Sequence, residues 1–118
     1  MDRLLEELEA WGCDTATALE RVLGDRELYG SCLVLFAEDK NFELCADALQ
    51  KQDYRAAFEA AHALKGVAAN LELTPLQKAI STLVEALRSH RPQEDCNAAF
   101  CQIETARARL DALLKKEG

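Results

Sequence analysis

The chain has 118 residues, of which 49% are apolar and 6% aromatic, and its formal net charge at pH 7 is −7. This length predicts one domain, residues 1–118, and the abundance of Ala and Leu favours helices packed on helices. The negative charge argues against nucleic acid and anionic membranes as partners, because their phosphates would repel it. No apolar run approaches the ~20 residues of a membrane span, and residues 1–7 lack the layout of a signal peptide, so we expect a cytoplasmic protein.

Residues 1–24 predict two short helices. An acidic helix over residues 1–11 is closed by Gly12, and its apolar face comprises Leu4, Leu5, Leu8 and Trp11. Asp14 or Thr15 can cap a second helix that stops at Gly24, and its apolar residues are Leu19, Val22 and Leu23.

A longer helical element follows, for which Asp25 is a suitable N-cap. Its heptad-like apolar positions are Leu28, Cys32, Leu35, Phe42, Ala46 and Leu49. Residues 39–41 interrupt this pattern, so the element is either one long helix with a kink or two helices in line.

Three further amphipathic helices complete the chain. Asp53 can cap a helix over residues 54–71, and the next helix starts at Thr74 and Pro75, a capping hydroxyl followed by proline at the first helical position. That helix ends near residues 90–92, and the last one covers residues 94–116. We therefore expect an all-α fold, an antiparallel four-helix bundle with the short N-terminal helices packed as a lid.

Five cysteines are present, an odd number without C-x-x-C spacing, which argues against a disulfide framework and a zinc site. A free cysteine often behaves as a small hydrophobe. Three of the five fall at core-like positions of helical stripes, and we expect them to be reduced and buried: Cys32, Cys45 and Cys96.

The most regular helical pattern surrounds a histidine. The apolar stripe of this helix comprises Ala57, Ala60, Ala61, Leu64, Val67, Ala68 and Leu71. At about 100° per residue, His62 lies opposite the centre of the stripe and should face water, with Gly66 on the same side and Lys65 on its flank. A glycine inside a helix costs roughly 0.5–1 kcal/mol relative to alanine, and here it helps no core. This combination indicates a functional site.

The string H-A-L-K-G at residues 62–66, followed by A-A-N-L at residues 68–71, resembles the signature of histidine-containing phosphotransfer (HPt) domains, the phosphoryl carriers of two-component phosphorelays. The likeness extends upstream through residues 23–29 and 52–54. It implies that His62 accepts a phosphoryl group from a receiver-domain aspartate and passes it to another receiver. The receivers would belong to response regulators or hybrid histidine kinases. They would bring Mg²⁺, and this chain would need no cofactor of its own.

Phosphoryl transfer asks mainly for in-line positioning and charge neutralisation around a loose transition state. An imidazole suits a carrier, because much of an ordinary histidine population is neutral, and so nucleophilic, near pH 7. Lys65 at i+3 can place its ammonium beside the phosphoryl oxygens, and Gly66 at i+4 removes a side chain that would hold a docking partner away. No nucleotide-binding loop is present, so we expect a phosphocarrier without autokinase activity, not an enzyme.

Other residues of this helix are candidates for partner docking. Phe58 lies on the outer side, one turn before His62, and it either joins an apolar docking patch or packs under the helical element over residues 26–51. Three further residues border the site: Glu59, Ala69 and Asn70.

Glu59 and His62 also form a Glu-x-x-His, the spacing that di-iron bundles use. Such sites need two of these motifs and two further glutamates, all pointing inward. The other histidine, His90, has Leu87 at the matching place, so we expect no metal.

Three positions differ from the pattern of the HPt domains that the sequence resembles. Glu72 stands where members often have a glycine near the end of the helix. Val67 replaces a small residue, but it lies on the predicted core stripe. Val84 occupies a place where many members carry a polar Glu or Gln near the histidine, and loss of that neighbour would leave the imidazole less firmly oriented.

The sequence therefore favours a phosphoryl carrier that acts through His62. The alternative is a helical adaptor of the same fold that binds a receiver or a kinase without phosphotransfer. The intact H-x-L-K-G motif counts against this alternative, and Val84 counts for it. A purely structural bundle would leave Gly66 unexplained.

Overall fold

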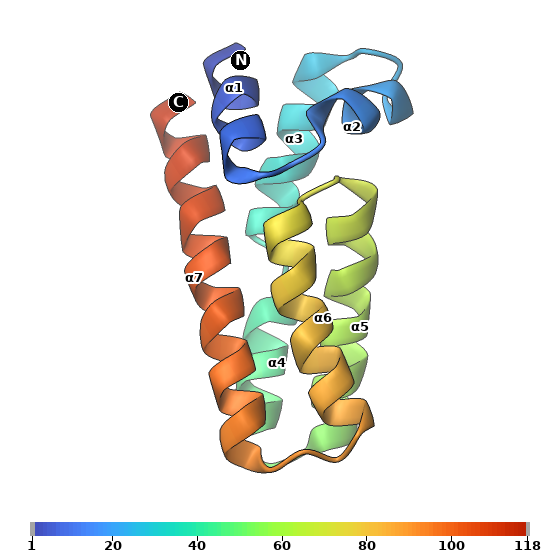
Figure 1. The fold of residues 1–118 in the computed structure, drawn as a ribbon, viewed down its shortest axis with the longest axis vertical. Helices are drawn as coiled ribbons and strands as arrows, with labels where there is room; N and C mark the ends of the chain where they lie inside the picture. The colour runs from blue at the N-terminus through green and yellow to red at the C-terminus, as the bar shows by residue number, and fades with distance from the viewer. Residues whose placement is uncertain (1, 118) are drawn as a thin grey trace.

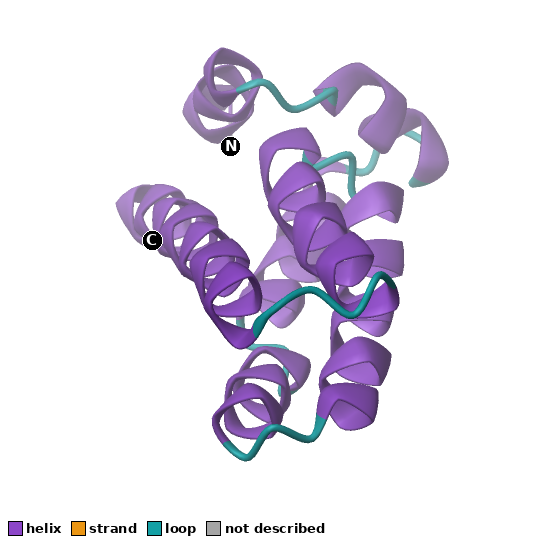
Figure 2. Ribbon diagram, turned by 60° about the horizontal axis from the view of Figure 1, so that its bottom comes forward, coloured by secondary structure: helices purple, strands orange, loops and turns teal. Residues whose placement is uncertain are grey.

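The computed structural model describes residues 2–117, and the regular elements in that range are all helices. Their bounds are α1 Asp2–Trp11, α2 Thr15–Arg21, α3 Arg26–Ala37, α4 Asn41–Gln50, α5 Tyr54–Asn70, α6 Thr74–Arg88 and α7 Gln93–Glu117. The predicted all-α fold is confirmed, and short loops join the helices (Figure 2). None of the described helices is long and apolar enough to cross a membrane.

Helices α4, α5, α6 and α7 form the predicted antiparallel bundle (Figure 1). Consecutive helices pack against one another, and α7 also contacts α4, which closes the bundle. The connections at residues 51–53, 71–73 and 89–92 are short, so each helix must run antiparallel to the one before it. The long α7 extends beyond α4 to pack against α3 and α1.

The N-terminal helices α1 and α2 lie over the end of the bundle at which α5 turns into α6 (Figure 1). α1 packs against α7, and α2 packs against α3. The backbone N–H of Asp14, in the loop between α1 and α2, donates to the carbonyl oxygen of Glu72 in the α5–α6 turn at 3.3 Å. This arrangement confirms the expected lid.

Aspartates start three of the helices. Asp14, Asp25 and Asp53 each accept a hydrogen bond from the backbone N–H three residues later, at distances of 3.1, 3.0 and 3.2 Å. Each satisfies a donor that the first helical turn leaves free. At α6 the prediction is wrong in detail, because Leu73 is the N-cap residue, Thr74 is already helical and no side chain caps this end.

α3 and α4 are separate helices, so a single kinked helix is excluded. The buried stripe of α3 also lies one residue away from the predicted one. Tyr29, Leu33 and Phe36 are buried, whereas Leu28 and Leu35 are exposed, Leu35 by 70%. Both series are apolar and have the same helical spacing, so the sequence pattern does not distinguish them.

The three bundle turns share one way of ending a helix. Gln52, Glu72 and His90 follow the C-caps of α4, α5 and α6 and have positive φ angles of 61°, 56° and 53°. Each turn also contains the paired backbone hydrogen bonds of a Schellman motif. Leu23, after α2, has a φ of 56° as well and is 96% exposed, so its predicted place on an apolar face is wrong.

Burial of the cysteines follows these helical registers. Cys45 and Cys96 are buried, as predicted, and so is Cys13. Cys32 is only half-buried, because the core stripe of α3 runs through its neighbour Leu33, and its predicted burial is wrong. Burial raises the pKa of the Cys13 and Cys45 thiols to about 11, which keeps them protonated and unreactive near neutral pH.

Arg107 of α7 connects α7 to the break between α3 and α4. Its Nε and Nη2 donate to the carbonyl oxygen of Ala37, the last residue of α3, at 3.0 and 2.8 Å. Its Nη1 lies 2.9 Å from Oε1 of Glu43, and the guanidinium lies over the ring of Phe42, 4.3 Å from its centroid. The hydrogen bond from Arg107 holds the pKa of the Glu43 carboxyl below its usual range.

Replacing Arg107 by Ala should lower the free energy of unfolding by about 1–3 kcal/mol, because a helix-end carbonyl and the Phe42 ring lose their partner. The measurement is urea denaturation followed by circular dichroism. Lys115→Ala is the control, since the pair of Lys115 with Asp111 on its own helix is exposed. It should change stability by no more than about 0.5 kcal/mol. Equal stabilities of the two variants would contradict the role given to Arg107.

Candidate functional site

The candidate site lies on α5, a helix with a narrow buried face of mostly small residues. The buried residues are Ala57, Ala60, Ala61, Leu64 and Ala68. α4 and α6 pack on either side of this helix, and alanine side chains allow such neighbours to approach closely. The outward half of α5 is thereby left for residues that the core does not need.

His62 is exposed on this outward side, which confirms its predicted placement. Side chains in a helix lean toward the N-terminus, so the imidazole lies over the preceding turn. There its ring faces the ring of Phe58, with centroids 5.7 Å apart and planes inclined by 31°.

Phe58 is half-buried and packs against the core, and it lies beside α6. Its part in partner docking stays a prediction. The guanidinium of Arg88, in α6, lies 5.8 Å from the centroid of the Phe58 ring. Phe58 therefore connects the histidine to α6.

Lys65 and Gly66 flank His62 on the next turn, Lys65 half-buried and Gly66 exposed. Because helical side chains lean backward, the side chain of Lys65 is directed toward the turn of His62. Apart from the adjacent residues and the nearby backbone of α5 itself, a Cβ atom added at Gly66 would have no heavy atom within 4 Å. The fold therefore has no packing requirement for glycine at this position.

The other predicted docking residues share this side of α5 to different extents. Glu59 is exposed and lies 3.5 Å from Arg55 in an ion pair on the same helix. Asn70 is exposed and Ala69 is half-buried. Val67, which we expected on the core stripe, is 37% exposed, so that prediction is wrong.

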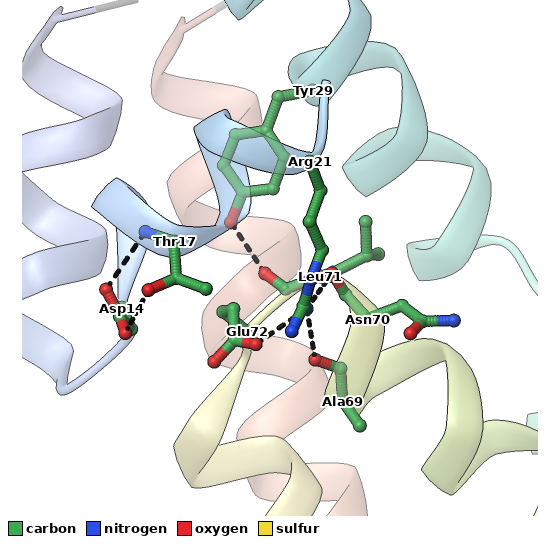
Figure 3. Close-up of polar contacts among 8 residues, drawn as sticks. All are labelled: Asp14, Thr17, Arg21, Tyr29, Ala69, Asn70, Leu71 and Glu72. Atoms are coloured by element: carbon green, nitrogen blue, oxygen red, sulfur yellow. Dashed lines mark hydrogen bonds and ion pairs between the residues drawn. The ribbon is translucent and has the colours of Figure 1, made fainter. Parts of the chain in front are cut away.

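An arginine that the sequence did not point to holds the end of α5 (Figure 3). Nη1 of Arg21, in α2, donates to the carbonyl oxygens of Ala69 and Asn70 at 3.1 and 2.7 Å. It also pairs with Glu72 at 2.6 Å. Carbonyls of the last helical turn have no amide four residues on in the helix to accept from, and that of Ala69 also accepts from the Glu72 N–H. Arg21 gives both carbonyls a side-chain donor, so α2 both caps α5 and fixes the lid to the helix that carries His62.

Glu72 accounts for one departure from the family pattern. Its φ of 56° is in the left-handed region, where a glycine is favoured. The end of the helix nevertheless keeps its Schellman hydrogen bonds, from Glu72 N to Ala69 O at 3.1 Å and from Leu73 N to Ala68 O at 3.0 Å. The side chain that replaces glycine here supplies the carboxylate that binds Arg21.

Val84 is fully buried in α6, so it gives the imidazole no polar neighbour. Phe58 of α5 lies opposite Arg88 of α6, and the helices are antiparallel. Four residues forward on α5 therefore correspond to four residues back on α6, which places residue 84 at the level of His62. Among the side chains of residues 2–116, no hydrogen bond involves the His62 side chain.

The Glu59-x-x-His62 pair does not resemble an inward-facing metal site. Both residues are exposed, and Glu59 is already paired with Arg55. Across the side chains of residues 2–116, no cluster of three or more His, Cys, Asp or Glu has the geometry to hold a metal ion.

Comparison with protein families identifies one match of nearly full length. The model of the family described as "Hpt domain" matches residues 1–116. Comparisons with curated proteins and with solved structures give no match.

Glycine and alanine at position 72 should differ in stability. Both Glu72→Gly and Glu72→Ala remove the pair with Arg21, but only alanine keeps a side chain in the left-handed conformation. The free energy of unfolding of the glycine variant should be about 1 kcal/mol higher than that of the alanine variant. Urea denaturation of the two variants side by side is the measurement, and equal midpoints would contradict strain at this residue.

Proposed function

Because this chain belongs to the Hpt domain family, we propose that it carries a phosphoryl group on His62 between receiver domains of a two-component system. Hpt domains are phosphocarriers in two-component signalling. The finer assignment is that a receiver aspartyl phosphate donates to His62 and that a second receiver accepts from it.

The observation that carries this proposal is the local environment of His62. The imidazole is exposed on a helix whose opposite face is fixed in the core, and a lysine and a glycine without a packing role follow it. The other histidine, His90, occupies the left-handed position after α6, a role in the backbone turn.

The chemistry divides between two proteins. A nitrogen lone pair of His62 attacks the phosphorus of the aspartyl phosphate, the N–P bond forms, and the bond from phosphorus to the carboxyl oxygen breaks. Lys65 neutralises charge on the phosphoryl oxygens as they approach. The receiver supplies the aspartate and Mg²⁺, and this chain supplies the nucleophile on a rigid helix.

An adaptor function remains the second candidate, and the burial of Val84 is what favours it. An imidazole without a polar neighbour at that level is less firmly oriented for transfer. An adaptor would bind a receiver through the same face of α5 without accepting its phosphoryl group.

The proposal predicts that His62→Gln abolishes labelling by a panel of pre-phosphorylated receiver domains. Because the side chain is exposed, the variant should keep its helical circular dichroism and its stability within about 0.5 kcal/mol. His90→Gln is the matched control and should be labelled at the wild-type rate. Receivers that bind the wild-type chain without labelling it would instead support the adaptor.

Gly66→Ala should affect stability and transfer from a receiver in opposite directions. The methyl group meets no other side chain or element beyond the adjacent residues, so the free energy of unfolding should rise by roughly 0.5–1 kcal/mol. Transfer from a receiver should nevertheless slow on the order of tenfold or more, because a side chain would hold the partner away from the in-line position. Labelling by phosphoramidate, a donor too small to meet the methyl group, is the internal control and should not change. An unchanged rate with receivers would remove Gly66 from the site.

A further inference from the structure

The ring of Phe58 forms an aromatic pair with the imidazole of His62. The centroid separation of 5.7 Å and the tilt of 31° lie within the range of favourable aromatic pairs. The contact joins residues i and i+4 of one helix, and the imidazole leans toward the N-terminus over the Phe58 turn. One side of the imidazole is therefore covered by a neighbour on its own helix.

Phe58 is itself held from two directions. Its ring is half-buried and packs against the edge of the core. From α6, the guanidinium of Arg88 lies 5.8 Å from the ring centroid, and Arg88 also pairs with Glu85 on its own helix at 2.5 Å. A residue held in this way restricts its neighbour more than a freely rotating side chain would.

At the level of His62, α6 has the fully buried Val84 and so gives the imidazole no polar partner. The contact with Phe58 is made at this level. We propose that Phe58 is a positioning residue, whose ring holds the imidazole of His62 in one orientation in place of a hydrogen bond from α6. This inference rests on the proposed function, and it replaces the docking role that the sequence suggested for Phe58.

The test compares Phe58→Leu with Phe58→Tyr, which keeps the ring, and with Tyr54→Leu. Tyr54 is an exposed aromatic residue one turn earlier on the same helix, so its variant is the matched control. Two readouts are taken: the NMR signals of the carbon-bound imidazole protons of His62, and the rate at which phosphoramidate labels His62. Phosphoramidate passes its phosphoryl group to the imidazole with release of ammonia, and it needs no docking surface.

Phe58→Leu should shift the His62 signals, because the ring current of Phe58 is lost, and should slow labelling by phosphoramidate roughly threefold to tenfold. Phe58→Tyr should retain both properties, and Tyr54→Leu should change neither. Thermal unfolding of each variant establishes that the fold is intact.

Two results would overturn the proposal. One is a Phe58→Leu protein with unchanged His62 signals and an unchanged phosphoramidate rate. The other is a rate loss with receivers alone, which would return Phe58 to a docking role. If neither receivers nor phosphoramidate label the wild-type chain, the proposed function fails, and the NMR comparison alone decides whether Phe58 orients His62.

Discussion

Close packing of α5 through a face of alanines and one leucine is the constraint on which the site depends. α4 and α6 flank this helix, so the helix is held on both sides while half of its circumference stays in solvent. A carrier histidine needs both properties, since in-line transfer requires a fixed nucleophile and a partner protein requires an open approach. Larger residues on the buried face would separate the neighbouring helices, and larger residues on the outer face would obstruct a partner.

The ends of the helices fix the remaining geometry. Left-handed residues close the three bundle turns, and none of them is glycine. At the end of α5 the conformation is supported by Arg21, which binds both the last carbonyls of the helix and the carboxylate of Glu72. The lid is thus joined to the helix that carries His62. Arg107 has the corresponding role at the end of α3, where it binds the carbonyl oxygen of Ala37.

Local signals in the sequence predicted much of this architecture. Helical periodicity placed His62 in solvent, and aspartates marked three helix starts. The buried stripe of α3 was misplaced, because two apolar series share one spacing and only the tertiary contacts select Tyr29 over Leu28. The hydrogen bonds of Arg21 reach Ala69 and Asn70, which lie 48 and 49 positions further along the chain. Periodic patterns in the sequence carry no information at that separation. The contact of Phe58 with His62 was within reach, because i and i+4 side chains meet on a helix, but its support by Arg88 depends on the register between α5 and α6.

A relay reconstituted from three purified components measures whether His62 carries a phosphoryl group between receivers. One receiver is phosphorylated and freed of donor, a second receiver starts unlabelled, and the chain is added in catalytic amount. We expect phosphoryl label to move to the second receiver only when the chain is present, and the chain to pass through an acid-labile adduct on His62. Transfer between the receivers at the same rate without the chain, or transfer through the chain with His62 unlabelled, would contradict it.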